Sequence, residues 1–364
     1  MHGTLPSRRI RNGPSSTDDE ACRVAIRKGS KSFHAASLLL PREVRRSALA
    51  LYAFCRLSDD MVDGEVAMDG APASAPVMGA TRHLSARLDR VYAGDPADHP
   101  ADRAFADAVA RHAIPRELPD ALIEGFEWDE SGRRYATIED LHGYGARVAA
   151  SVGAMMTLAM GRRDPTVLAR ACDLGLAMQL TNIARDVGED ARAGRLYLPE
   201  TWLREAGLDP DGFLGDPRHC ARVAGVVERL LAEAQRLYAR SRSGIGALPP
   251  SCRTAIMAAL SIYRDIGREI ARAGHDSVSR RAHTSRNRKL VLAAASGRAS
   301  LLRGRIDRTP AEPAVRHLIE AVERTPPSPP RAPEAGLGRM VMLLGSMEGR
   351  EGVSLSARPQ RAPR

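Results

Sequence analysis

Two acidic segments carry the side chains best suited to chemistry. The first, residues 52–63, reads YAFCRLSDDMVD, and the second, residues 179–190, reads QLTNIARDVGED. If each segment is a helix, two aspartates four residues apart share one of its faces, one turn apart. The pairs are Asp59 with Asp63 in the first segment, and Asp186 with Asp190 in the second.

Carboxylate oxygens at this spacing suit Mg²⁺, which keeps several waters and shares phosphate oxygens with a substrate. Each segment also holds an arginine, Arg56 or Arg185, and a guanidinium can bind a phosphate through two parallel hydrogen bonds. If the two helices face one another, their four carboxylates enclose a site for Mg²⁺ and a diphosphate. The alternative is a pair of solvated acidic faces that only form salt bridges.

Helical periodicity covers most of the chain and must position these segments. Apolar residues recur at helical spacing over residues 42–64 and again over residues 164–187. No convincing alternating strand appears, and no hairpin dipeptide lies between apolar runs. We therefore predict an all-α protein.

The two ends of the chain lack this periodicity. We predict a low-order tail at residues 1–17, one all-α domain over residues 18–305, and a Pro/Arg-rich low-order tail at residues 306–364. Such segments bury too little apolar surface to offset the entropy of ordering them. A short apolar patch at residues 340–344 interrupts the second tail, and we expect it either to pack on the body or to rest on a membrane surface.

Composition argues against several functional classes. The formal net charge of +10 is spread along the chain and only 4% of residues are aromatic, so we expect no nucleic-acid partner. No uncharged apolar run reaches the roughly 20 residues of a membrane span, and the N-terminus has no apolar signal core. The five cysteines are scattered without a CxxC pair, which favours the cytoplasm. The positive charge favours peripheral attraction to the inner face of the membrane.

Further motifs occur in an order that resembles the squalene/phytoene synthase family of head-to-head prenyl transferases. The two acidic segments are similar to that family's YAxCRxxDDxVD and QLTNIxRDVxED signatures. Other matches are KSF with LLP within residues 31–41, VAASVG at 148–153, GRLYLP at 194–199, and the stretch 263–281. Together they cover about residues 20–300, and the match is nearest to the bacterial phytoene synthases of carotenoid pathways.

The resemblance implies the isoprenoid synthase fold, with helices around a central apolar cavity. It implies a Mg²⁺-dependent 1′-1 condensation of two geranylgeranyl diphosphates, through prephytoene diphosphate, to phytoene, which is the first step of carotenoid biosynthesis. Mn²⁺ is an alternative ion, and no NADPH is expected for this product. Prenyl diphosphates are the implied substrates, with other carotenoid-pathway enzymes as candidate partners.

The resemblance also assigns roles to individual residues. The implied metal ligands are Asp59, Asp63, Asn182, Asp186 and Asp190, and the four aspartates are catalytic together with Arg56 and Tyr263. The implied substrate-binding residues are Ser30, Ser32, Tyr52, Arg56, Tyr144, Gln179, Asn182, Arg185, Tyr197 and Arg280. The ordinary alternatives are salt bridges for the arginines, helix capping for the serines, and core packing for the tyrosines.

One motif departs from the family pattern. Many members read YCYxVAG where residues 144–150 read YGARVAA, which leaves the shape of one cavity wall and the prenyl chain length open. A squalene, dehydrosqualene or presqualene diphosphate synthase using farnesyl diphosphate is therefore an alternative. A non-catalytic assembly or binding relative is another, although erosion of the aspartates would be its mark and all four are present.

Overall fold

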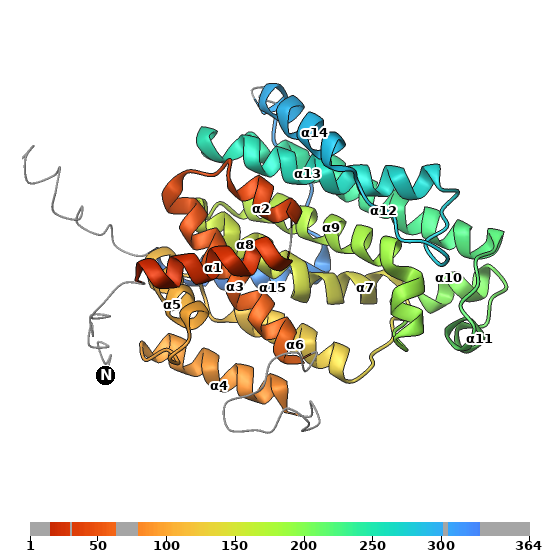
Figure 1. Cartoon of the computed structure of the whole chain (residues 1–364), viewed down its shortest axis with the longest axis horizontal. Helices are drawn as coiled ribbons and strands as arrows, with labels where there is room; N and C mark the ends of the chain where they lie inside the picture. The colour runs from red at the N-terminus through yellow and green to blue at the C-terminus, as the bar shows by residue number, and fades with distance from the viewer. Residues whose placement is uncertain (1–14, 30, 63–78, 301–304, 328–364) are drawn as a thin grey trace, which may run out of the picture. The chain divides into compact units, whose positions relative to one another are not determined.

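Helices provide all the regular structure in the part of the chain that the computed structural model describes, namely residues 15–29, 31–62, 79–300 and 305–327. The all-α prediction is thus confirmed. In chain order (Figure 1) the helices are α1 (Ser16–Gly29), α2 (Lys31–Ser37), α3 (Arg42–Val62), α4 (Ala80–Ala93), α5 (Pro100–His112), α6 (Glu117–Glu130), α7 (Ile138–Gly145), the π-helix η1 (Ala146–Ala150), α8 (Ser151–Ala159), α9 (Pro165–Arg192), α10 (Glu200–Glu205), α11 (Pro210–Gly215), α12 (Ala221–Ile245), α13 (Pro250–Arg272), α14 (Arg286–Ala299), the 3₁₀ turn η2 (Pro313–Val315) and α15 (Arg316–Arg324).

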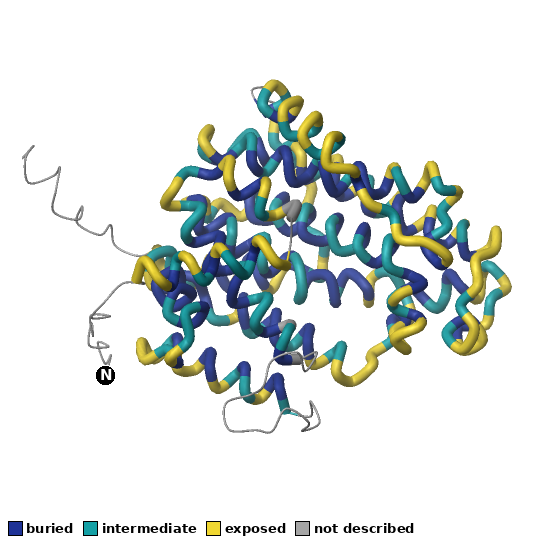
Figure 2. Tube along the Cα trace, in the orientation of Figure 1, coloured by how far each residue is buried: buried dark blue, intermediate teal, exposed yellow. Residues whose placement is uncertain are grey.

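The long helix α9 is the central element and carries the second acidic segment. Its start is well defined, because the Asp164 side chain accepts hydrogen bonds from the backbone N–H groups of Thr166 and Val167, and Pro165 occupies the first helical position. It packs against α12, α8, η1 and α13. Figure 2 shows the buried segments gathered around it.

Residues 52–62 of the first acidic segment lie on α3, which packs on α1, α5 and α8. Helices α3 and α9 do not pack extensively on each other in the described part of the chain; instead, α8 contacts both of them, and α13 contacts both α9 and α2. The two acid-bearing helices are therefore held apart by shared neighbours, as an intervening site requires.

The departure at residues 144–150 lies where α7 passes through η1 into α8. Single π-helical turns inside α-helices recur at functional sites. The small residues Ala146 and Ala150 are fully buried there, and η1 packs on α9. The motif that departs from the family pattern is thus part of the packing that positions α9.

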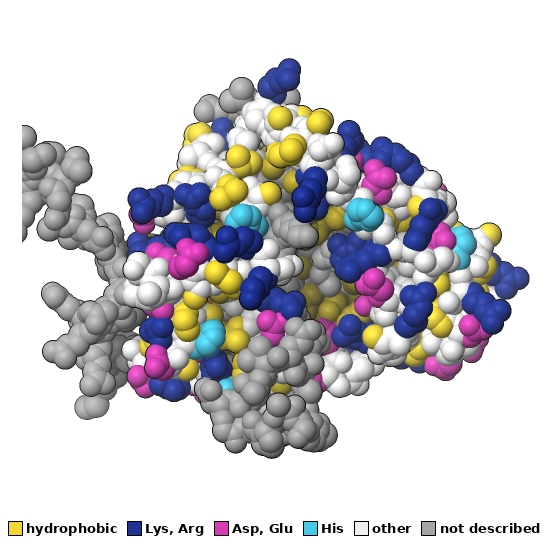
Figure 3. Space-filling view, in the orientation of Figure 1, with side chains coloured by type: hydrophobic (Ala, Val, Ile, Leu, Met, Phe, Trp, Pro, Cys, Tyr) yellow, Lys and Arg dark blue, Asp and Glu magenta, His cyan; other side chains and the backbone are white. Residues whose placement is uncertain are grey.

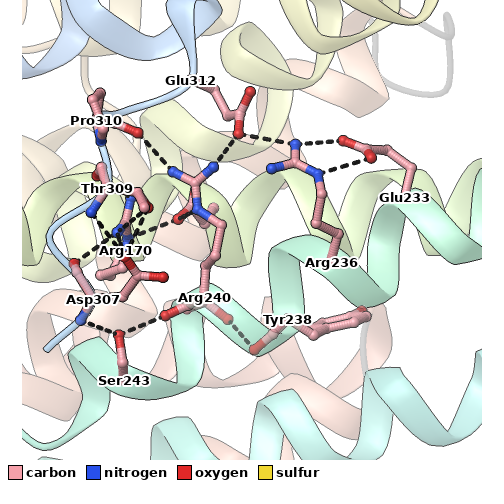
Figure 4. Close-up of polar contacts among 12 residues, drawn as sticks. Arg170, Glu233, Arg236, Tyr238, Arg240, Ser243, Asp307, Thr309, Pro310 and Glu312 are labelled. Atoms are coloured by element: carbon pink, nitrogen blue, oxygen red, sulfur yellow. Dashed lines mark hydrogen bonds and ion pairs between the residues drawn. The ribbon is translucent and has the colours of Figure 1, made fainter. Parts of the chain in front are cut away.

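The ordered body continues beyond the predicted domain end at residue 305, so the expectation of low order fails for residues 306–327. Arg170 is 1% exposed and donates to the backbone carbonyls of Asp307 and Thr309 (Figure 4). Arg240 forms ion pairs with Asp173 and Glu312.

Helix α15 then buries Leu318, Ile319 and Val322. The buried Arg170 and the half-buried Arg163 donate to backbone carbonyls in this stretch, which composition alone does not reveal. The patch at residues 340–344 lies outside the described residues.

Candidate active site

One face of α9 changes from apolar to polar along its length while remaining partly exposed. Leu174 and Met178 lie toward its N-terminal half, and Asn182, Asp186 and Asp190 follow at successive turns. The Asn182 amide lies 3.5 Å from the Gln179 side-chain oxygen, which places Gln179 beside this face. A prenyl diphosphate has the same division, with an apolar chain and an anionic head.

Asp190 marks an excess of negative charge at the polar end of this face. Burial, together with the nearby carboxylates of Asp186, Asp129 and Glu189, raises the pKa of its carboxyl to about 7, although Arg195 opposes this shift. A buried carboxyl among other carboxylates is stabilised by an added cation.

Two arginines hold Asp186. Arg185 donates to it through Nε, 2.8 Å from Oδ1, and Arg281 donates through Nε to Oδ1 at 2.8 Å and through Nη2 to Oδ2 at 3.1 Å. Arg281 also lies 3.2 Å from Glu189. The resemblance pointed to Arg280, but the Arg280 side chain donates to the carbonyl of Ala273. The structure thus brings Arg281, rather than Arg280, to the aspartates.

Gly188 allows the segment that carries Arg281 to approach α9. The Gly188 N–H donates to the carbonyl of Ser277 at 2.9 Å, and a Cβ atom at Gly188 would lie 2.2 Å from the Val278 carbonyl oxygen. Arg192 donates to the same Val278 carbonyl. The glycine in the second acidic segment is therefore a packing requirement that fixes the chain just before Arg281.

On the other side of the site, α3 presents Tyr52 and Arg56 next to the end of α1. A Cβ at Gly29 would lie 2.3 Å from the Tyr52 hydroxyl and 3.4 Å from Cδ of Arg56. Arg56 forms an ion pair with Asp60 one turn along α3.

The remaining predicted residues on this side are only partly described. Asp59 lies on α3 and Ser32 on α2, but their side chains fall outside the described part of the chain, as do Ser30 and Asp63 altogether. Their assigned roles stay predictions.

Tyr263 of α13 connects the two sides. Burial raises the pKa of its hydroxyl to about 12; Arg185 opposes this shift, while Tyr52 and Asp186 contribute to it. The ring of Phe33 lies 5.4 Å from the Tyr263 ring and 6.3 Å from the Tyr52 ring, centroid to centroid. Tyr52 of α3 and Asp186 of α9 therefore both lie near Tyr263.

Asp129, at the end of α6, is a site residue that sequence reasoning missed. It accepts hydrogen bonds from the hydroxyls of Tyr144 at 2.9 Å and Tyr197 at 2.7 Å, whose rings stack with centroids 5.2 Å apart. Its charge raises the pKa of Asp190. Asp129 has no acidic partner at helical spacing within a recognised motif, so no sequence signal marked it.

These residues fit a divalent cation that is completed by a substrate. Among the described residues, no group of three or more His, Cys, Asp or Glu side chains is placed to hold a metal ion. Asp186 and Asp190 offer two carboxylates, with Asn182 one turn away. Mg²⁺ is commonly bound by one or two carboxylates together with waters and substrate phosphate oxygens, so this donor set suits Mg²⁺.

The surroundings of the site are basic, and a separate hollow lies elsewhere on the surface. Figure 3 shows Lys and Arg side chains gathered on the viewed face around a central hollow. The separate hollow, of about 390 Å³, is lined by residues of α1, α2 and α3, among them Asp19, His34 and Arg46. It includes none of the predicted site residues, so we assign it no part in the chemistry.

Residues 26–288 match the family model described as squalene/phytoene synthase, which is well over half of the chain. The chain belongs to the squalene/phytoene synthase family. The resemblance drawn from the motifs is confirmed, and with it the expectation of a prenyl-transferring enzyme. Within the described residues, no helix combines the length and apolar character needed to cross a membrane.

Two similar members of the squalene/phytoene synthase family are named phytoene synthase. The one from Rhodobacter capsulatus is 53% identical over 84% of this chain and 89% of its own length. The one from Cereibacter sphaeroides is 50% identical over 93% of this chain and 95% of its own length.

Solved structures agree on the fold. A dehydrosqualene synthase with a bound ligand aligns with a TM-score of 0.68 at 28% identity, over 77% of this chain and 95% of that one. The squalene synthase of Alicyclobacillus acidocaldarius aligns with a TM-score of 0.63 at 27% identity, over 71% and 95% of the two chains. The expected isoprenoid synthase fold is thereby confirmed.

Proposed function

We propose that this chain joins two geranylgeranyl diphosphates head to head, through prephytoene diphosphate, to form phytoene. The observation that carries the proposal is the identity of 53% and 50% to two phytoene synthases along most of all three chains. The squalene-type structures are much less similar, at 27–28% identity. The site has one end suited to the diphosphate group and another end suited to the prenyl chain.

The diphosphate end is formed by α9 and its neighbours. Asp186 and Asp190, with Asn182, would hold Mg²⁺, or Mn²⁺ in its place; when bound, the ion supplies positive charge where negative charge develops on the departing diphosphate. Arg185 and Arg281 already pair with Asp186, so both guanidinium groups are at hand to bind phosphate oxygens. By resemblance, Asp59 and Arg56 of α3, together with Asp63, complete this end.

The prenyl end is formed by apolar and aromatic side chains. Leu174 and Met178 lie on the same face of α9 as the aspartates, toward the N-terminal half of the helix, and both are partly buried. Met156 of α8 is also partly buried. Such a lining excludes water, which would quench an allylic cation. The rings of Tyr52 and Tyr263 present π faces that can stabilise positive charge.

A product assay tests the proposal. Purified protein with Mg²⁺ is supplied with geranylgeranyl or farnesyl diphosphate, with and without NADPH, and the hydrocarbon is analysed by mass. We expect phytoene from geranylgeranyl diphosphate, without any need for NADPH. Squalene or dehydrosqualene from farnesyl diphosphate, in place of phytoene, would overturn the proposal. Because phytoene is a hydrocarbon, we also propose a cytoplasmic protein that associates peripherally with the membrane.

A further inference from the structure

Helix α14 presents large apolar side chains to solvent. Leu290 is 70% exposed and Val291 is 58% exposed, and Ala294 and Ala295 continue the same exposed face one turn on. The residue that α14 buries is Ser296. Figure 2 shows the helix exposed along much of its length. A surface helix normally has the opposite arrangement, with its apolar face inward.

Polar contacts fasten α14 to α13. Arg288 forms an ion pair with Asp265, a carboxylate that is fully buried, at 3.0 Å. The Ser296 hydroxyl lies 3.3 Å from that of Ser261, and the hydroxyl of Ser300, which caps the helix, lies 3.0 Å from that of Thr254. The helix is therefore held by hydrogen bonds and an ion pair, which leaves Leu290 and Val291 free to face outward.

The other exposed large apolar side chains lie on α2 and the turn that follows it. Within the described residues these are Phe33 of α2 and Leu38 and Leu39 of the turn that follows it. Both α2 and α14 pack on α13. Figure 3 shows hydrophobic side chains gathered over α14. An exposed apolar surface of this kind marks a contact with another molecule or a membrane.

Charge identifies what covers this face. From residue 277 to residue 306 the sequence has eight Lys or Arg residues and no Asp or Glu. Two of them, Arg281 and Arg288, pair with carboxylates of other elements; Arg286 and Arg298 are exposed at the two ends of α14. A second copy of this chain would bring the same positive charge and be repelled, whereas anionic phospholipid attracts it.

We propose that the outward face of α14, with Leu290 and Val291 at its centre, docks the protein on the surface of an anionic phospholipid bilayer. The choice of a lipid occupant rests in part on the proposed function, because prenyl chains and a hydrocarbon product partition into a bilayer. Helix α14 packs on α13, which carries Tyr263, so docking brings the membrane next to the wall of the site.

Vesicle cosedimentation of the full-length protein tests this proposal. The vesicles contain three parts phosphatidylcholine to one part phosphatidylglycerol, with phosphatidylcholine alone as the neutral comparison. We expect wild-type protein to bind the anionic vesicles and to be released by added salt. Leu290→Ser with Val291→Ser should lower partitioning about tenfold, while Leu290→Phe with Val291→Phe should retain it. Wild-type-like partitioning of the serine variant would overturn the proposal.

A charge-matched pair separates local from overall electrostatics. Arg286→Gln with Arg298→Gln should lower binding to the anionic vesicles about tenfold, whereas Arg204→Gln with Arg222→Gln on α10 and α12 removes the same net charge and should have a much smaller effect. Equal losses in both pairs would contradict docking through α14. A wild-type dimer that the serine variant dissociates, without vesicle binding, would assign the face to a second copy and likewise overturn the proposal.

Binding is measured without substrate, so it does not depend on the reaction. Turnover of geranylgeranyl diphosphate in detergent is measured on the same proteins, and it should be unchanged in the serine variant because neither residue is part of the site. If the detergent assay yields no phytoene while vesicle binding behaves as expected, the proposed function fails and α14 docking stands.

Discussion

Arg281 forms a bidentate ion pair with Asp186, although Arg281 lies outside the helix that carries the aspartate. Its Nε and Nη2 atoms lie 2.8 and 3.1 Å from the two carboxylate oxygens, and its Nη1 lies 3.2 Å from Glu189. This pairing joins the non-helical stretch after α13 to the acidic face of α9. A diphosphate that binds at the aspartates therefore meets a guanidinium already in place.

Neighbouring arginines test this relationship. Arg281→Ala should lower kcat/KM for geranylgeranyl diphosphate about 100-fold, because it removes a charged donor where negative charge develops. Arg280→Ala is the matched control; the Arg280 side chain donates to the Ala273 carbonyl, so its loss should change kcat/KM by no more than about threefold. Steady-state kinetics of both variants decides, and a larger loss from Arg280→Ala would restore the assignment made from the resemblance.

A pair of glycines tests how Arg281 is positioned. Gly188→Ala would place a Cβ 2.2 Å from the Val278 carbonyl oxygen, so we expect a loss of about 1–3 kcal/mol in the free energy of unfolding and a raised KM. Gly225→Ala in α12 meets no atom within 4 Å and should stabilise the protein by about 0.5–1 kcal/mol. Denaturant unfolding and kinetics are measured together; an unaltered KM in Gly188→Ala would show that the approach does not position Arg281.

Helical periodicity predicted the features that depend on spacing along the chain. The expected helices at residues 42–64 and 164–187 are α3 (Arg42–Val62) and α9 (Pro165–Arg192). Because helical spacing fixes which residues share a face, the sequence alone was enough to place Asn182, Asp186 and Asp190 together.

Features that depend on packing between distant segments could not be predicted in this way. Arg280 and Arg281 lie in a stretch without regular structure, so no period tells which one points at α9. Asp129 accepts hydrogen bonds from Tyr144 and Tyr197, which come from other parts of the chain, so spacing along the sequence does not reveal its place at the site. Residues 306–327 read as part of a proline-rich tail, yet the buried side chain of Arg170 donates to the carbonyls of Asp307 and Thr309.

Metal dependence follows from the acidic face. We expect a chelator to stop turnover and Mg²⁺ to restore it, because the diphosphate cannot approach Asp186 and Asp190 without added positive charge. Asp59→Asn and Asp186→Asn should each abolish measurable turnover with little change in thermal stability. Asp164→Asn on the same helix as Asp186 should remain active, since asparagine caps a helix about as well as aspartate. Full activity of Asp186→Asn at every Mg²⁺ concentration would refute metal binding there.

His112 gives a pH dependence of stability. Burial, with a contribution from Arg111, lowers the pKa of its imidazole from 6.5 to about 4, and the ring lies 2.8 Å from the Ser47 hydroxyl. Between those pH values the unfolded chain binds a proton that the folded chain does not. The free energy of unfolding is therefore unaffected by His112 above about pH 6.5, and it falls as the pH is lowered from 6.5 to about 4. Tm should therefore fall less in His112→Gln than in the wild-type protein between pH 6.5 and about 4. An identical fall in the two proteins would contradict a role of His112 in this pH dependence.

Two truncations test whether the segment after residue 305 belongs to the fold. Removal of residues 310–364 deletes α15, and with it the buried side chains Leu318, Ile319 and Val322, each of which contributes about 1.5–3 kcal/mol. It also takes Glu312 from Arg236 and Arg240. The combined loss approaches the total stability of a typical domain, about 5–15 kcal/mol.

We therefore expect the protein without residues 310–364 to be insoluble or unfolded, whereas removal of residues 328–364 deletes none of these contacts. The shorter deletion should keep a cooperative thermal transition and measurable turnover. Arg163 makes the same distinction in a full-length protein, because it donates to the carbonyls of Val322 and Thr325 and Arg163→Ala should lower Tm. If the longer deletion is as stable and active as the shorter one, packing of α15 does not support the site, and the boundary near residue 305 predicted from the sequence is the functional one.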